Sequence, residues 1–269
     1  MSPPGRLMSP LPTHRLAQLS DLHLTTHNEP FAGQIDTDAQ LRLALQRLAH
    51  AGQRLDAVVL SGDLTDAGSP AAYQRLRALI DEQARLLGCP ILVGAGNHDS
   101  KQAFNASLGP ADNVTEVRGL RIIQLDSSVS GTDQGELSAS QLDWLAQVLA
   151  TPAEHGTVLV VHHPPAPSAS VVMSVATLRN IADLAGVVAG ADVRIILSGH
   201  WHTPASSTFA GIPVAVAGGV SYVADPLFQA RGYRALVGGQ SFNLVEFYPG
   251  QVVTLVVPVT AATLHQIDL

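Results

Sequence analysis

Short apolar runs alternate with longer segments of helical period along most of the chain. The apolar runs predict strands over residues 15–19, 57–60, 91–93, 120–125, 157–161 and 193–197. Between them, apolar residues at helical spacing predict helices over residues 39–50, 70–88, 138–149 and 175–188. Strands and helices therefore take turns through the first two-thirds of the sequence.

Residues that start and stop helices support these boundaries. Ser69 is a favoured N-cap, Pro70 suits a first helical position, and Gly88 is a typical C-terminal stop. Ser138 and Gln141 have the spacing of a capping box, in which side chains and backbone amides bond reciprocally. We therefore expect helices to begin directly after Ser69 and Ser138.

The pattern changes after residue 205. Residues 212–216, 242–247 and 252–257 predict strands with no helix between them, and residues 224–239 predict a glycine-containing loop. This order indicates an α/β fold with sheets flanked by helices, not an all-parallel barrel. We find no internal repeat or linker, so we predict one domain over residues 14–269 after a flexible N-terminal segment, 1–13.

Composition narrows the class of protein. Of 269 residues, 46% are hydrophobic and 14% charged, which makes a packed core feasible. The net charge of −7 and the lack of a basic run argue against nucleic acid as a partner. No apolar run is long enough to span a membrane. The single cysteine, Cys89, allows no intramolecular disulfide and suits a buried position, so we predict a cytoplasmic protein.

Side chains that bind metals recur where predicted strands end. The five clusters are Asp21-Leu22-His23, Gly62-Asp63-Leu64-Thr65-Asp66, Gly96-Asn97-His98-Asp99, His162-His163-Pro164 and Gly199-His200-Trp201-His202. Each cluster alone is a weak signal, because a single histidine at a strand end is usually structural. In α/β sheets, however, ligands bind in the crevice beyond the carboxyl ends of the strands. Five clusters at such ends predict one shared site.

The spacing within the clusters suggests how they act. In extended backbone, residues i and i+2 point the same way, so Asp21 and His23 can grip one ion. His200 and His202 can face the same cavity for the same reason. Adjacent residues point apart, so Asn97 and His98 are expected to differ in role, as are His162 and His163. Glycine before Asp63, Asn97 and His200 would let the backbone turn off the strand.

The motif order D-x-H, G-D-x-x-D, G-N-H-D, H-H-P and G-H-x-H resembles the calcineurin-like metallophosphoesterase family, over residues 16–203. The resemblance implies a four-layer αββα sandwich, in which helices flank two mixed β-sheets. It also implies two divalent or mixed-valence metal ions, and the nitrogen and oxygen ligands without thiolate favour Fe, Mn or Zn. Homodimers are common among these relatives, so we expect a homodimer.

The resemblance also implies roles for individual residues. The implied ligands of the first metal are Asp21, His23 and His202; those of the second are Asn97, His162 and His200; and Asp63 bridges the two. His98 resembles a catalytic histidine near the substrate phosphate, and Asp66 the carboxylate that orients it. The residues implied to contact substrate are His23, Asp63, Asn97, His98 and His202. Two divalent ions and two carboxylates leave a double positive charge, which suits a hydroxide and a phosphodiester monoanion.

Within the family, the chain is most similar to bacterial class III cyclic nucleotide phosphodiesterases. The stretches that carry this likeness are residues 19–24, 61–68, 135–145 and 161–165. We therefore expect a small-molecule phosphodiester substrate, a 3′,5′-cyclic nucleotide such as cAMP or cGMP. The alternatives are a broader phosphodiesterase acting on 2′,3′-cyclic nucleotides or glycerophosphodiesters, and a non-catalytic metal-binding partner module. A DNA repair nuclease of the same family is disfavoured by the net charge.

Few aromatic residues could recognise a nucleotide base. Trp201 lies inside the G-H-x-H motif, and alternation points it away from the metals, so we expect it to pack in the core. Tyr222, Phe228 and Tyr233 are the candidates for contacting a base, although each also suits a structural role. Only 4% of residues are aromatic, which predicts loose base recognition.

Overall fold

The computed structural model describes residues 11–168, 170, 173–228 and 232–260. The first of its two large sheets contains five strands. The strands are β1 (His14–Leu19), β2 (Ala57–Ser61), β3 (Ile91–Gly94), β12 (Ser241–Tyr248) and β13 (Gln251–Pro258), in the order β13-β12-β1-β2-β3. β1, β2 and β3 are parallel, whereas β12 and β13 are antiparallel to their neighbours. The three parallel strands therefore end at one edge, where their polar clusters follow.

The second sheet contains six strands and is also mixed. They are β4 (Asn113–Val117), β5 (Leu120–Leu125), β6 (Thr157–Val161), β7 (Val193–Ser198), β8 (Ala205–Phe209) and β9 (Ile212–Val216), in the order β4-β5-β6-β7-β9-β8. The inner four run parallel, and the edge strands β4 and β8 run antiparallel. β6 and β7 thus bring the later histidine motifs to the ends of parallel strands.

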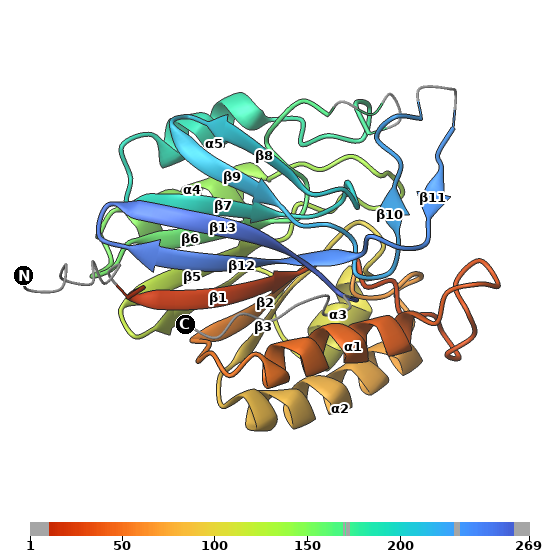
Figure 1. Cartoon of the computed structure of the whole chain (residues 1–269). Coiled ribbons are helices and arrows are strands. Elements are labelled where there is room, and N and C mark those ends of the chain that lie inside the picture. The colour runs from red at the N-terminus through yellow and green to blue at the C-terminus, as the bar shows by residue number, and fades with distance from the viewer. Residues whose placement is uncertain (1–10, 169, 171–172, 229–231, 261–269) are drawn as a thin grey trace, which may run out of the picture.

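Helices cover the outer face of each sheet (Figure 1). α1 (Thr37–His50), α2 (Pro70–Leu87) and α3 (Lys101–Leu108) pack their apolar residues against the first sheet, and α4 (Ala139–Leu149) and α5 (Ile181–Val188) pack against the second. A third apolar cluster, including Leu16, Val59, Val158 and Ile195, fills the space between the sheets. The result is the four-layer αββα sandwich that the resemblance implies, so this prediction is confirmed.

The predicted helix over residues 175–188 is wrong in its first part, because α5 begins only at Ile181. The preceding segment is paired with another loop. Gly135 donates its amide to the Thr177 carbonyl at 3.0 Å and accepts from the Arg179 amide at 2.9 Å. Asn180 accepts from the Leu137 amide. These backbone groups are therefore satisfied across the loop, and a helix would have to break that pairing.

Some elements were not predicted from the sequence. α3, β4 and β8 are short and lie between predicted elements. The predicted loop over residues 224–239 includes a two-stranded ribbon, β10 (Val223–Ala224) and β11 (Ala235–Leu236), which stands apart from both sheets on the right of Figure 1. Residues 1–10 of the predicted N-terminal segment lie outside the described residues. Within the described part of the chain, no helix is both long and apolar enough to cross a bilayer.

A buried polar network ties the two sheets together. Gln18 on β1 donates through Nε2 to Ser61 Oγ at 3.0 Å and to the Ser198 carbonyl on β7 at 2.8 Å. Its Oε1 accepts from Asn243 Nδ2 on β12 at 2.9 Å. All four residues are at most 1% exposed. Because buried polar groups need partners, this network favours one relative position of the sheets.

We predict that Gln18→Leu lowers the free energy of unfolding by about 1–3 kcal/mol, because the buried Asn243 amide loses its acceptor. Urea denaturation followed by circular dichroism measures the change. Gln74→Leu, on an exposed face of α2, is the matched control and should change stability by at most about 0.5 kcal/mol. An equal change in both variants would contradict the proposed importance of the network.

Candidate metal centre

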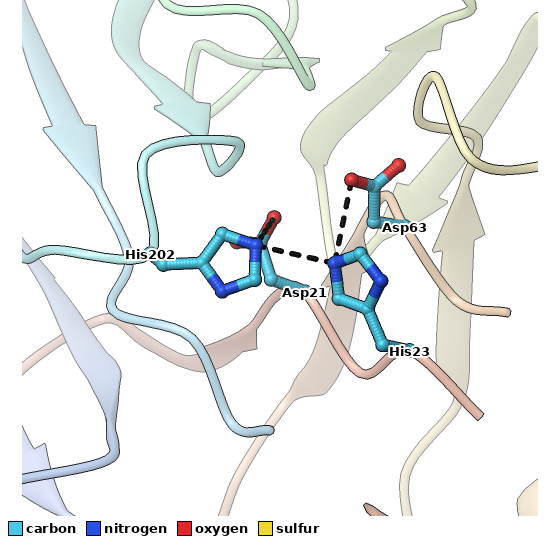
Figure 2. A group of neighbouring side chains, drawn as sticks. All are labelled: Asp21, His23, Asp63 and His202. Atoms are coloured by element: carbon cyan, nitrogen blue, oxygen red, sulfur yellow. Dashed lines mark hydrogen bonds and ion pairs between the residues drawn. The ribbon is translucent and has the colours of Figure 1, made fainter. Parts of the chain in front are cut away.

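Six buried side chains converge beyond the carboxyl ends of the parallel strands. Donor atoms of Asp21, His23, Asp63 and His202 lie within 4.8 Å of one another and could hold one metal ion (Figure 2). A second group of this kind contains Asp63, His162 and His200. Asp63 belongs to both groups. The first sheet supplies the carboxylates and His23, and the second sheet supplies the other three histidines.

The atoms within these groups lie at close range. Asp63 Oδ2 is 3.3 Å from His162 Nε2 and 3.6 Å from His23 Nε2. Asp21 Oδ1 is 3.5 Å from His202 Nε2. The Nε2 atoms of His23 and His202 face each other at 3.1 Å. Each of these residues is at most 3% exposed, so the cluster is shielded from solvent.

The backbone at these positions is left-handed. The positive φ angles are 55° at Asp21, 46° at His23, 49° at Asp63, 70° at His200 and 55° at His202. The expectation that extended backbone aligns residues i and i+2 is therefore wrong, although Asp21 and His23 do converge. A non-glycine residue in this region is strained, and such strain gathers at functional sites. Hydrogen bonds hold the conformation, including His200 N to Asp21 Oδ1 at 3.0 Å.

Gly96 and Gly199 allow neighbouring atoms to come close to the backbone and do not form a left-handed turn. Of the three glycines predicted to turn the chain off a strand, only Gly62 has a left-handed φ, at 105°. A Cβ atom on Gly96 would overlap the backbone nitrogen and a carboxylate oxygen of Asp63. One on Gly199 would overlap the hydroxyl of Ser20. These positions therefore need glycine because neighbouring loops touch their backbone.

Every candidate histidine ligand is held through its other ring nitrogen. The pairs are His23 Nδ1 with Asp66 Oδ1 (3.1 Å), His162 Nδ1 with Ser61 O (2.9 Å), His200 Nε2 with Ala176 O (2.7 Å) and His202 Nδ1 with Tyr222 O (3.2 Å). Histidines that bind metals almost always donate their second N–H to a carboxylate or a carbonyl, which sets the tautomer. The remaining nitrogen is then free to bind an ion.

Burial and charge set the protonation of these groups. Burial disfavours ionised Asp63, but the positive charge of His162 outweighs it and holds the pKa of Asp63 well below its ordinary value. Burial likewise opposes protonation of His162, yet the negative charge of Asp63 raises the pKa of His162 to about 9. Burial, reinforced by the charge of His23, lowers the pKa of His202 well below its ordinary value. His202 is then a neutral imidazole, the form that binds metals.

The residues fit bound metal. His162 Nε2 and Asn97 Oδ1 are buried atoms without a hydrogen-bond partner, and the 3.3 Å approach of Asp63 to that nitrogen lacks hydrogen-bond alignment. Unpartnered buried polar atoms are costly unless something else satisfies them. Divalent cations would satisfy both the atoms and the charges.

His98 and Asp66 lie at the solvent-facing side of the cluster. The His98 side chain is 40% exposed, unlike the buried histidines, and its Nδ1 is 2.9 Å from the Asp66 carbonyl oxygen. The Asp66 carboxylate was expected to orient His98, but Oδ1 is 3.8 Å from His98 Nδ1 and 3.1 Å from His23 Nδ1. His98 is thus oriented by the backbone of Asp66, and His23 by its carboxylate.

Asp99 is a residue to which the sequence assigned no role. Its buried carboxylate accepts from the amides of Leu64, Thr65 and Gly96 and from the Tyr73 hydroxyl. It therefore fastens the loop that carries Asp63 to the loop that carries Asn97. Its place at the end of the G-N-H-D motif was the available signal.

The neighbouring histidines His162 and His163 have different hydrogen-bond partners. His163 is buried but belongs to none of the groups of potential metal ligands, and it bonds Ser127 Oγ and the Asp133 carbonyl instead. Trp201 is 8% exposed and packs in the core of the second sheet, which confirms its predicted role. Cys89 is buried in the core of the first, also as predicted.

Two proteins named as phosphodiesterases are similar to this chain over most of its length. The chain is 44% identical over 256 residues to a cAMP/cGMP dual specificity phosphodiesterase of Mycobacterium tuberculosis, covering 93% of this chain and 80% of that protein. It is 32% identical over 194 residues to the 3′,5′-cyclic adenosine monophosphate phosphodiesterase CpdA of Escherichia coli K12, covering 70% of this chain and 69% of that protein.

A solved structure and a family model complete the comparison. The fold is similar to that of a dimetal phosphatase from Danio rerio, with a TM-score of 0.60 at 15% identity, over 93% of this chain and 97% of that one. The family model of the calcineurin-like phosphoesterases matches residues 14–204, well over half of the chain. The chain therefore belongs to the calcineurin-like phosphoesterase family and is a hydrolase.

Proposed function

We propose that this chain is a dinuclear-metal phosphodiesterase that hydrolyses 3′,5′-cyclic nucleotides, converting cAMP to AMP and also accepting cGMP. The observation that carries the proposal is the shared carboxylate of Asp63, which belongs to both groups of potential ligands. The relatives named as cyclic nucleotide phosphodiesterases support the substrate class. A homodimer, a cytoplasmic location and a single domain over residues 14–269 remain predictions from the sequence.

The proposed ligands follow the two groups of side chains. Asp21, His23 and His202 would hold one ion, Asn97, His162 and His200 the other, and Asp63 both. Asn97 is assigned to the second ion by the family resemblance of its G-N-H-D motif, and its Oδ1, buried without a hydrogen-bond partner, leaves it able to bind one. Two bound divalent ions would supply Lewis acidity and lower the pKa of a water molecule enough to make hydroxide available near neutral pH. The donor set favours Mn, Fe or Zn.

His98 is the proposed general acid. Its backbone amide donates to Asp63 Oδ1 at 2.9 Å, which fixes the residue beside the shared carboxylate. Its Nδ1–H donates to the Asp66 carbonyl oxygen, so Nε2 is left to face the substrate. When the imidazole is protonated, Nε2–H can pass its proton to the leaving alkoxide oxygen. Asp66 also steadies His23 through its carboxylate and thereby links the acid to the metal centre.

Two other readings remain as alternatives. A broader phosphodiesterase would use the same residues on 2′,3′-cyclic nucleotides or glycerophosphodiesters, and comparison of turnover on these substrates separates it. A non-catalytic metal-binding module would have no use for an exposed histidine held beside the metal centre. The position of His98 therefore favours an enzyme.

We predict that Asn97→Ala lowers the metal content from two ions towards one per chain and cuts kcat by about a hundredfold or more. The reason is loss of one ligand and of a group that faces the phosphate. Elemental analysis after gel filtration and steady-state kinetics measure both effects. Asn113→Ala, exposed on β4, is the matched control. Two retained metals together with full activity would overturn the assignment of Asn97.

We predict that His98→Ala keeps both metals but slows hydrolysis of cAMP by roughly 10²–10⁴-fold, the usual contribution of a general acid. A nitrophenyl diester should lose much less, since nitrophenolate leaves without protonation. The experiment compares kcat for both substrates, with His50→Ala on the exposed end of α1 as control. Equal losses for the two substrates would argue against the acid role.

We predict weak discrimination between bases, with kcat/KM for cAMP and cGMP within about tenfold, or about 1.4 kcal/mol in transition-state binding. Most binding energy would come from the phosphate at the centre. Diesters should react faster than monoesters. Two divalent metal ions together with the carboxylates of Asp21 and Asp63 leave a double positive charge. A phosphomonoester dianion and a hydroxide together carry more negative charge than this. Steady-state kinetics at one pH test both points. A preference of about a thousandfold for one base, or faster cleavage of monoesters, would contradict them.

A further inference from the structure

The aromatic side chains that the sequence offers for base contact are engaged in packing. Tyr222 is 8% exposed and stacks on His202, with ring centroids 4.0 Å apart, and on Phe31 at 5.0 Å. Tyr233 packs edge-on against Tyr222 at 5.9 Å, and Phe228 lies 4.3 Å from the Arg234 guanidinium. These rings support His202 and the β10–β11 ribbon. Tyr222 is therefore too buried to stack on a base, whereas Tyr233 is 38% exposed.

Three adjoining cavities begin at His98 and run away from the metal centre. They have volumes of about 360, 470 and 560 Å³. The first is lined by Asp66, Asn97 and His98, and it shares residues 99, 100 and 131 with the second. The second and third share Lys101 and residues 128–130. We call this the polar groove, with one wall formed by residues 97–102 and the other by residues 128–133.

The lining of the polar groove suits a neutral ligand rich in hydrogen-bonding groups. It contains hydroxyls, amides and carboxylates but no Phe, Tyr or Trp side chain. The one ammonium group, on Lys101, lies 3.0 Å from the buried Asp126 carboxylate, which offsets its charge. Ribose hydroxyls and the polar edge of a base match such a surface. A phosphodiester whose alcohol part is apolar or strongly charged would match this surface poorly.

The far wall of the groove is fastened to the metal centre by His163. The ring of this buried residue contacts Ser127 Oγ at 2.8 Å and the Asp133 carbonyl oxygen at 3.1 Å. Its centroid is 4.5 Å from that of His200. A Cβ atom on Gly135 would overlap the His163 ring, so the loop passes directly over it. The groove is therefore held in a set position relative to the candidate metal ligands.

We propose that the polar groove is the subsite for the nucleoside part of a cyclic nucleotide substrate, an inference that rests on the proposed phosphodiesterase function. With the phosphate at the metal centre and the leaving oxygen at His98, the ribose and base extend between the walls at Gln102 and Ser130. Both residues are exposed, so the base keeps contact with water. An open polar subsite contributes affinity while discriminating little between bases.

The test narrows the groove from each wall with the variants Ser130→Trp and Gln102→Trp. Their kcat and KM are compared for cAMP, cGMP and methyl 4-nitrophenyl phosphate, a diester without a nucleoside. We expect KM for both cyclic nucleotides to rise, so that kcat/KM falls at least about tenfold more than for the small diester. Inhibition by 5′-AMP should weaken in parallel. Ser206→Trp, exposed on β8, is the matched control and should change none of these values.

The outcomes separate the two proposals. Equal losses for cyclic nucleotides and the small diester in both groove variants, or unchanged inhibition by AMP, overturn the subsite while leaving the phosphodiesterase function standing. Wild-type protein that cleaves methyl 4-nitrophenyl phosphate but neither cyclic nucleotide overturns the proposed function and the nucleoside subsite together. A selective loss in Ser130→Trp and Gln102→Trp, absent in Ser206→Trp, supports both.

Discussion

The rest of this structure depends on one constraint, the burial of two carboxylates within a single cluster of histidine imidazoles. Asp21 and Asp63 are at most 2% exposed, and no Lys or Arg in the described part of the chain forms an ion pair with either. Burying such charges is expensive unless they are paired or coordinate a cation. The four surrounding histidines are held so that one nitrogen of each can bind a metal. The site is therefore organised for cations.

The sandwich architecture allows this concentration of polar groups. Each sheet buries one apolar face under helices and the other against its partner, so both sheets can end their parallel strands at one edge. The carboxylates come from the first sheet and most imidazoles from the second. Any sliding of one sheet over the other would separate them. The Gln18 network, which reaches the Ser198 carbonyl just before His200, opposes such sliding.

The proposed metal ligands and the proposed nucleoside subsite fall on different sides of His98. On one side the side chains are buried, and left-handed backbone and two tightly packed glycines determine their positions. On the other side the polar groove is open and offers hydroxyls and amides. His163 joins the two sides, because it touches His200 and supports the groove wall. A rigid centre beside an open groove would select the geometry of the phosphate but would discriminate little between bases.

The sequence by itself determined which residue types occur, in what order, and at which strand ends they lie. Alternation, caps and glycine stops are local signals, so the Ser138 capping box and the main strands could be read directly. The directions of the side chains could not, because they depend on atoms far away in the chain. The Asp66 carboxylate bonds His23 rather than His98, and residues before Ile181 pair with Gly135 rather than forming a helix. Only the tertiary structure decides such choices, since several local conformations are open to each segment and distant partners select one.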